Sequence, residues 1–131
     1  MFSRLLWLIV EKSLNFELKT MNSAEIKQYL LNRLLEEHAF WSYDKDSVAD
    51  ISDWNLIKFV LIHLDLPEIN LLFEIYSKRM IKKVWLKELV RQGDFLKNMN
   101  LAFALLYFNI KEPVSYLKRM ETYYLNRDAE K

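Results

Sequence analysis

Histidine and acidic side chains are the first residues to consider for chemistry, because together they bind metals and transfer protons. The chain has two histidines, and each lies beside a carboxylate, in Glu37-His38 and His63-Leu64-Asp65. Sequence neighbours point in different directions on a helix, and neither pair has the i, i+4 spacing that places two ligands on one face. A zinc site needs three or four convergent ligands. We therefore expect structural roles for both histidines and no metal site.

Asp65 and Glu68 are a second candidate, because paired carboxylates can act as general acid and general base. Their spacing is also typical of a helix start, in which Asp65 caps the first turn and Glu68 lies three residues further on. Pro67 fits the same interpretation, since its missing N–H has no helical partner in a first turn. A cap explains both carboxylates without a further assumption, and we prefer it.

Activated nucleophiles are the remaining catalytic possibility. There is no cysteine, and the single glycine cannot form the G-x-S-x-G turn that exposes a nucleophilic serine. The same shortage of glycine removes most loops that bind phosphates through their backbone. We therefore expect a protein that is not an enzyme and that uses no cofactor.

Charge is the strongest chemical pattern in the chain. Residues 36 to 76 contain nine acids against two lysines, whereas residues 77 to 91 contain six bases against one acid. At about 100° per residue, this basic stretch places cations along one edge and apolar residues such as Ile81, Val84 and Trp85 on the other side. It predicts a basic amphipathic helix whose candidate partner-binding residues are Lys78, Arg79, Lys82, Lys83, Lys87 and Arg91.

The basic helix has three interpretations. The simplest is internal: the acidic part lies near the helix and neutralises it through exposed pairs, each worth about 0 to 1 kcal/mol. The second is an acidic protein partner. The third is nucleic acid, which is less expected because the net charge is only +1 and no helix-turn-helix with small turn residues is visible.

The composition indicates which kind of secondary structure positions these cations. One glycine and two prolines beside 52% hydrophobic residues favour helices joined by short polar turns. We expect an all-α, compact bundle or array of about six short helices. Their approximate ranges are 22–37, 53–64, 65–76, 78–90, 95–108 and a last helix that begins at Pro113.

Two groups of apolar residues lead to further predictions about burial. Leu101 to Phe108 is apolar without a break, which is typical of a helix buried at the centre of a bundle. Phe40, Trp41 and Tyr43 precede an acidic, turn-rich stretch, and we expect their rings to cover the helical core, because exposed they would form a large apolar patch.

The sequence pattern of the first 20 residues differs from that of the helical domain that follows. Asn22 begins a helix signature, so we expect residues 1–20 to be an extension outside the domain and 21–131 to be a single helical domain. The apolar run Leu5 to Val10 is too short for a secretory signal or a membrane span. We expect no membrane association and a cytoplasmic location.

A family resemblance rests on several short segments in a fixed order, from Phe40 to about Lys118. These segments are 40–43, 62–65, 81–85, 101–102, 107–111 and 116–118. In them the chain resembles a small bacterial all-helical domain of unknown function, whose members are often encoded beside a nucleotidyltransferase-type toxin of the abortive-infection class. The resemblance implies a helical fold, a bacterial setting and an antitoxin or accessory role, and it implies no site residues.

Together these observations favour a non-enzymatic protein-interaction module, with a toxin as a possible partner. One alternative is a nucleic-acid-binding protein that uses the basic helix 78–91. The other is a structural homo-oligomer in which the segment Leu5 to Val10 contacts a second copy.

Overall fold

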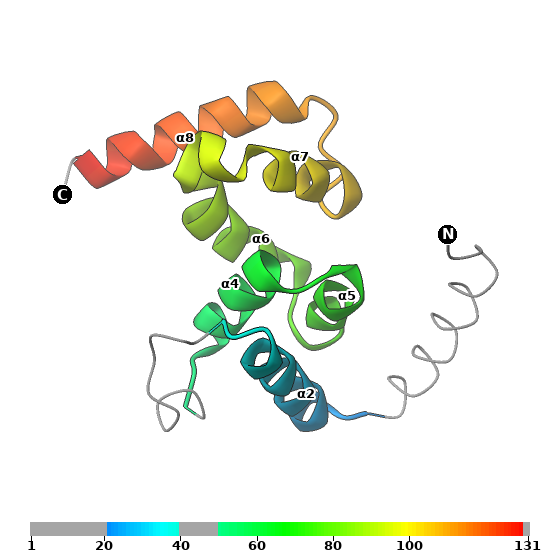
Figure 1. The fold of residues 1–131 in the computed structure, drawn as a ribbon. Coiled ribbons are helices and arrows are strands. Elements are labelled where there is room, and N and C mark those ends of the chain that lie inside the picture. The colour runs from blue at the N-terminus through cyan, green and yellow to red at the C-terminus, as the bar shows by residue number, and fades with distance from the viewer. Residues whose placement is uncertain (1–20, 40–49, 130–131) are drawn as a thin grey trace, which may run out of the picture.

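The computed structural model describes residues 21–39 and 50–129, and every secondary-structure element in these ranges is a helix (Figure 1). The predicted all-α fold class is confirmed, because no strand occurs in the described part of the chain. The elements are α2 (Ser23–Glu36), α4 (Asp53–His63), α5 (Leu66–Ile75), α6 (Lys78–Val84), the π-helical turn η1 (Trp85–Leu89), the 3-10 segment η2 (Val90–Leu96), α7 (Lys97–Leu106) and α8 (Pro113–Ala129).

Short polar side chains fix where several helices begin. Asn22 Oδ1 accepts a hydrogen bond from the Glu25 N–H at 2.9 Å, and Ser77 Oγ accepts one from the Met80 N–H at 3.1 Å. Ser52 does the same for α4. Each cap satisfies an amide that has no partner inside its helix, at a gain of about 1 kcal/mol. The helix start predicted at Asn22 is confirmed.

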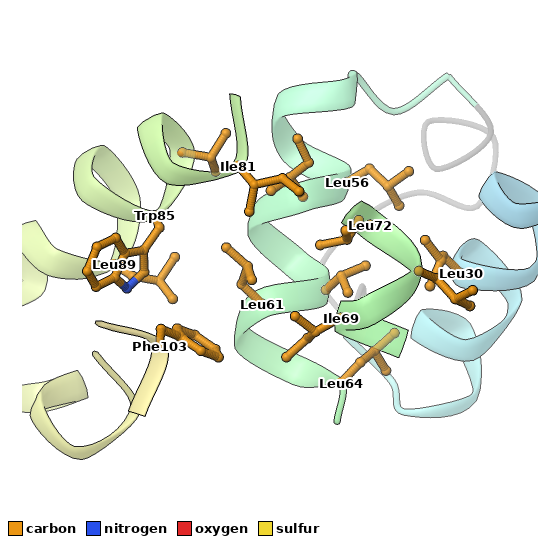
Figure 2. Packing of buried hydrophobic residues seen from close by; sticks show 14 of the residues in the cluster. Leu30, Leu56, Leu61, Leu64, Ile69, Leu72, Ile81, Trp85, Leu89 and Phe103 are labelled. Atoms are coloured by element: carbon orange, nitrogen blue, oxygen red, sulfur yellow. The ribbon is translucent and has the colours of Figure 1, made fainter. Parts of the chain in front are cut away.

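The helices form two groups joined by α6 and η1. Helices α2, α4 and α5 contact one another in the lower part of Figure 1, while η2, α7 and α8 contact one another in the upper part. One continuous core runs through both groups, from Leu30 of α2 to Trp85 and Phe103 (Figure 2). Because α6 and η1 supply Ile81, Trp85 and Leu89 to this core, the basic stretch is held in place by its buried face.

The predicted helix 78–90 is confirmed, but it is an α-helix only as far as Val84. It continues as the wider π turn of η1 and then as η2, in which Gly93 has a φ of 64° and a ψ of −134°. The buried Asn100 stabilises this break, because its Oδ1 accepts from Trp85 Nε1 at 3.0 Å and its Nδ2 donates to the Leu89 carbonyl at 3.2 Å. Gly93 therefore forms the predicted turn. The hydrogen bonds of Asn100 hold the π turn before it, and the sequence pattern does not indicate them.

The expectation of a fully buried helix over Leu101 to Phe108 is wrong. Phe103, Ala104 and Phe108 are buried, but Leu105 is 57% and Leu106 is 64% exposed. The physical reason is position: α7 lies at one end of the array and contacts η2 and α8, so only one of its faces is covered. An apolar run in a helix at the edge of a fold leaves leucines on the surface.

Several predictions concern residues outside the described ranges. These are the 1–20 extension with its Leu5 to Val10 segment, and the aromatic residues Phe40, Trp41 and Tyr43. The domain boundary at residue 21 therefore stays a prediction. Among the described helices, none combines the length and the apolar character needed to cross a bilayer.

A candidate cationic interaction surface on α6 and α8

Helix α6 presents its cations on the side opposite its buried face. Ile81 and Val84 are fully buried, whereas Lys78, Arg79 and Lys83 are exposed. Within the described ranges these three cations form no ion pair and no hydrogen bond through their side chains. The helix thus holds three solvated positive charges on a rigid base.

Two other predicted site residues are held by aromatic rings. Lys82 Nζ lies 5.5 Å from the ring centre of Tyr116 in α8, and Lys87 Nζ lies 5.7 Å from that of Trp54 in α4. Both lysines are half-buried. Such cation–π contacts stabilise by about 0.5 to 1 kcal/mol at partly exposed sites. Lys82 and Lys87 therefore also tie the basic stretch to its neighbouring helices.

Helix α8 adds a cation that the sequence analysis missed. Arg119 Cζ lies 5.9 Å from the ring centre of Tyr116, the same ring that Lys82 contacts. The i, i+3 spacing of Tyr116 and Arg119 was the available signal. Arg91, the last predicted site residue, lies on η2 beyond the π turn and is exposed. We define the cationic surface as Lys78, Arg79, Lys82, Lys83, Tyr116 and Arg119.

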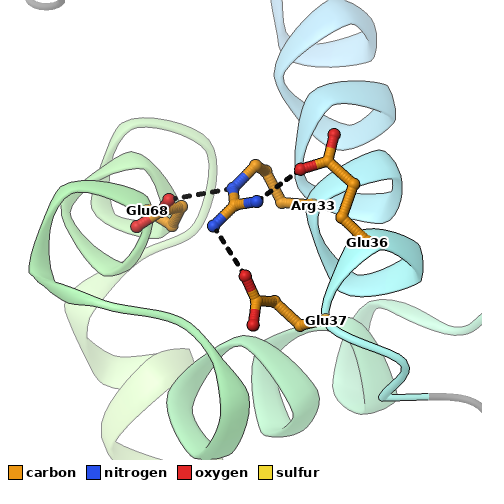
Figure 3. Close-up of polar contacts among 4 residues, drawn as sticks. All are labelled: Arg33, Glu36, Glu37 and Glu68. Carbon is orange, nitrogen blue, oxygen red and sulfur yellow. Dashed lines mark hydrogen bonds and ion pairs between the residues drawn. The ribbon is translucent and has the colours of Figure 1, made fainter.

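Four acids of the other group, in α2, α4 and α5, meet counter-charges within that group. Arg33 of α2 pairs with Glu36, Glu37 and Glu68 (Figure 3). Three carboxylates around one guanidinium raise the pKa of Arg33 above its ordinary value, chiefly through the hydrogen bonds with Glu36 and Glu68. These pairs differ from the simplest interpretation of the sequence, in which the basic helix neutralises the acidic region.

Of the remaining pairs, one lies within the acidic group and one joins the two groups. Lys27 of α2 lies 3.1 Å from Asp53 of α4. Glu88, the one acid inside the basic stretch, accepts from Trp54 Nε1 at 2.9 Å and lies 3.7 Å from Lys58 Nζ. In the described ranges, residues 21–39 and 50–76 carry eight acids and three bases, and residues 77–129 carry eleven bases and five acids. The molecule therefore has an acidic half and a basic half.

The cap predicted for Asp65 and Glu68 is partly wrong. Asp65 does occupy the N-cap position of α5, but its side chain makes no capping hydrogen bond. Glu68 is 8% exposed and accepts from Arg33 Nε at 3.2 Å instead, because the first turn of α5 faces α2. Its second oxygen, Oε2, is buried and has no hydrogen-bond partner within the described part. The two carboxylates do not form an acid–base pair with each other.

The histidines take up two different structural positions. His38 follows the end of α2 with a φ of 57°, and His63 in the last turn of α4 stacks on Phe59 at 6.0 Å between ring centres. The residues that the structure describes contain no group of three or more histidine, aspartate or glutamate side chains able to hold a metal ion.

Comparison with known proteins gives no relative from which a role could be transferred. No family model, no curated protein and no solved structure matches the chain. The resemblance between Phe40 and Lys118 stays a prediction, and the chemistry of the described residues must carry the functional argument.

Proposed function

We propose that this protein is a non-enzymatic interaction module that binds an acidic protein through its cationic surface. The observation that supports it is the set of three exposed cations, Lys78, Arg79 and Lys83, which have no ion-pair partner in the described ranges. Their helix is fixed by buried residues on its other face, so binding a partner requires little reordering of the backbone.

A compact acidic surface fits this molecule better than a nucleic acid does. The cationic surface is limited to one two-turn helix and its contact with α8, and the other half of the molecule is acidic. A long polyanion that extends past the cationic surface would meet that acidic half and be repelled. A protein partner can present a negative patch of matching size, which would chiefly increase the association rate.

A more specific proposal names the partner as a nucleotidyltransferase-type toxin, which the chain would neutralise as an antitoxin. Its support is the family resemblance alone. Co-expression tests it: the chain should restore growth to cells that produce the toxin, and a variant with Arg79→Glu and Lys83→Glu should not. Equal rescue by that variant would show that the chain neutralises the toxin without using the cationic surface.

The binding proposal is tested by quantitative affinity purification from the native host. The test variant carries Arg79→Glu and Lys83→Glu. The matched control carries Lys111→Glu and Arg127→Glu, which change net charge equally at two exposed positions outside the cationic surface. We expect an acidic protein that is recovered with the wild type and the control and is lost about tenfold with the test variant.

Two outcomes would contradict the proposal. An unchanged set of bound proteins with the test variant would show that the cationic surface is not used. A bound species that disappears on nuclease treatment, with affinity falling steeply as salt rises, would favour nucleic-acid binding instead.

A further inference from the structure

A hollow lies between α7 and α8, and one of its ends is at Gly93. Leu101 of α7 and Val114 and Leu117 of α8 supply its apolar walls, and its volume is about 70 Å³. One enclosed water molecule needs about 10 to 15 Å³ of such space, so the hollow has room for about five groups of that size. It can therefore hold a short aliphatic side chain, such as that of valine or leucine.

Four charged side chains line the same hollow, and their signs balance. They are Asp94, Lys97, Lys118 and Glu121. None of the four forms an ion pair, either with another of them or with any other residue that the structure describes. A bound molecule with only one kind of charge would meet two like charges here, whereas a molecule that carries both signs can pair with all four.

These charges follow a fixed order along the hollow. Helices α7 and α8 are neighbours that run in opposite directions (Figure 1). The acids come first, because Asp94 follows Gly93 directly and a Cβ on Gly93 would lie 2.8 Å from Glu121 Oε1. Lys97 and Lys118 lie three residues from these acids, about one helical turn along each wall. The apolar walls extend a further turn beyond the lysines.

A buried amide also lines this space. Asn100 is 2% exposed, and its side-chain nitrogen carries two hydrogens. One of these hydrogens is donated to the Leu89 carbonyl, and the other has no acceptor among the described residues. Because Asn100 lies one turn beyond Lys97, the second hydrogen is available to a carboxylate bound beside the lysines.

We infer that this hollow binds a small zwitterion with an aliphatic side chain, of the chemical class of a free α-amino acid such as leucine or valine. Its ammonium group pairs with the two acids, and its carboxylate pairs with the two lysines. Its side chain fills the space between α7 and α8. The inference does not rest on the proposed protein partner, because no residue of the cationic surface lines the hollow.

A helix of a partner protein fits the hollow less well. It would cover the apolar walls, but it could match the charges only with an acidic and a basic side chain on either side of one apolar residue. A free amino acid carries both charges and the side chain on one carbon atom, so a single small molecule matches the whole lining.

Nuclear magnetic resonance of the full chain tests this inference. The chain has one glycine, so labelling with isotopic glycine gives one backbone amide signal, that of Gly93 at the end of the hollow. Titration with leucine should shift this signal to saturation with a Kd of about 1 mM, which is the size expected for a ligand of so few atoms. Isocaproate lacks the amino group of leucine and isopentylamine lacks its carboxylate, so each should bind about tenfold more weakly.

Two variants each remove one charge, of opposite sign. Lys118→Gln and Glu121→Gln should each weaken leucine binding about threefold, which is typical of one exposed charge pair. Lys111→Gln is the matched control, since Lys111 is exposed and does not line the hollow. Arg79→Glu with Lys83→Glu should leave leucine binding unchanged while it abolishes binding of the acidic protein. The two proposals can therefore fail separately.

Three results would overturn the inference. One is the absence of a saturable shift with leucine at up to about 20 mM, far above the expected Kd. A second is that isocaproate or isopentylamine binds as tightly as leucine, because the hollow would then recognise only the apolar group. A third is that Lys111→Gln weakens binding as much as Lys118→Gln does. The comparison of ligands uses the unchanged chain, so it decides the matter even where a variant fails to fold.

Discussion

Asn100 is the most informative single residue in the interior, because it is a polar side chain at 2% exposure. Its amide satisfies two groups that would otherwise be buried without partners, the Trp85 indole N–H and the Leu89 carbonyl. The Trp85 ring also stacks on Phe108 at 4.7 Å. Asn100 therefore connects α7 to the π turn at the centre of the molecule.

Replacing Asn100 with leucine should destabilise the protein by about 2 to 4 kcal/mol. Two buried polar groups lose their partners, and each unsatisfied group costs about 1 to 3 kcal/mol. Urea denaturation followed by circular dichroism measures the loss. Adding Trp85→Phe removes one of the unpaired groups, so the double change should cost less than the sum of the single changes. Strict additivity would contradict the role given to Asn100.

Arg33 and Glu68 show a contact that local sequence patterns do not reveal. The two residues lie on different helices, 35 positions apart, and Glu68 is almost completely buried. A helix-start pattern explains why an acid stands at this position but not which group it contacts. The sequence therefore located the start of α5 and left the partner of Glu68 undetermined.

Arg33→Met should cost about 3 kcal/mol, because it leaves the Glu68 carboxylate buried without its counter-charge. Glu68→Leu added to this variant should recover most of the loss, since the pair is then replaced by apolar side chains. Denaturant midpoints of the two variants measure both effects. A double variant as unstable as Arg33→Met would show that the buried carboxylate is not the cause.

The contact between Tyr76 and Asp53 gives a prediction with a defined pH range. Tyr76 donates a hydrogen bond to Asp53, and this bond, followed by the one from Lys27, lowers the pKa of the Asp53 carboxyl. Because the folded pKa lies below the unfolded value of about 3.9, the stabilisation is present above about pH 4 and is lost as pH falls through the lowered pKa. Tyr76→Phe should therefore destabilise the protein at neutral pH, and by progressively less as pH falls below about 4.

Chemical denaturation of the wild type and Tyr76→Phe across this pH range measures the effect. The difference between their free energies of unfolding should shrink steadily below pH 4. A difference that stays constant with pH would mean that the variant acts through packing and not through the carboxylate.

At the scale of the elements, the break between η1 and α7 decides the shape of the C-terminal group. Gly93 adopts a positive φ, which L-residues with a side chain rarely do, and a Cβ at this position would lie 2.8 Å from Glu121 Oε1. The sequence predicted the turn correctly, because this is the only glycine in the chain. The π turn before it depends on Asn100, which no local pattern marks.

Gly93→Ala should destabilise the protein by about 1 to 3 kcal/mol, the usual cost of forcing a side chain into such a backbone conformation. Adding Glu121→Ala removes the nearby carboxylate and leaves the backbone unchanged. Thermal unfolding of both variants distinguishes the two causes, and we expect the double variant to remain nearly as unstable. Full recovery by Glu121→Ala would assign the cost to the contact with Glu121.

Helix α7 shows why periodicity alone misjudged burial. An unbroken apolar run has no polar face from which its orientation could be read, so the pattern cannot distinguish a central helix from one at the end of the array. The burial of Phe103 and Ala104 and the exposure of Leu105 and Leu106 follow from the position of α7 beside η2 and α8. That position is a property of the whole fold.

At the scale of the whole molecule, the uneven placement of charge is visible in the sequence, although its simplest interpretation was that the acidic part neutralises the basic helix. The change of sign near residue 77 is visible in the order of residues, and the structure converts it into an acidic group of helices and a basic one. The ion pairs between helices could not be predicted, because they join positions distant in sequence, whereas the pairs of Arg33 with Glu36 and Glu37 have the ordinary i, i+3 and i, i+4 spacing. Lys27 and Arg33 of α2 are the counter-charges of four of these acids, and in the described part none of the acids forms an ion pair with an exposed cation of α6.

Site-specific photo-crosslinking in the native host tests the central claim most directly. A photoreactive amino acid replaces Lys83 in the cationic surface in one variant and Gln28 on the exposed side of α2 in another. We expect a crosslink from position 83 to an acidic protein, and no crosslink to that protein from position 28. Crosslinks from position 83 only to nucleic acid, or equal crosslinks from both positions, would contradict a module that binds proteins through its cationic surface.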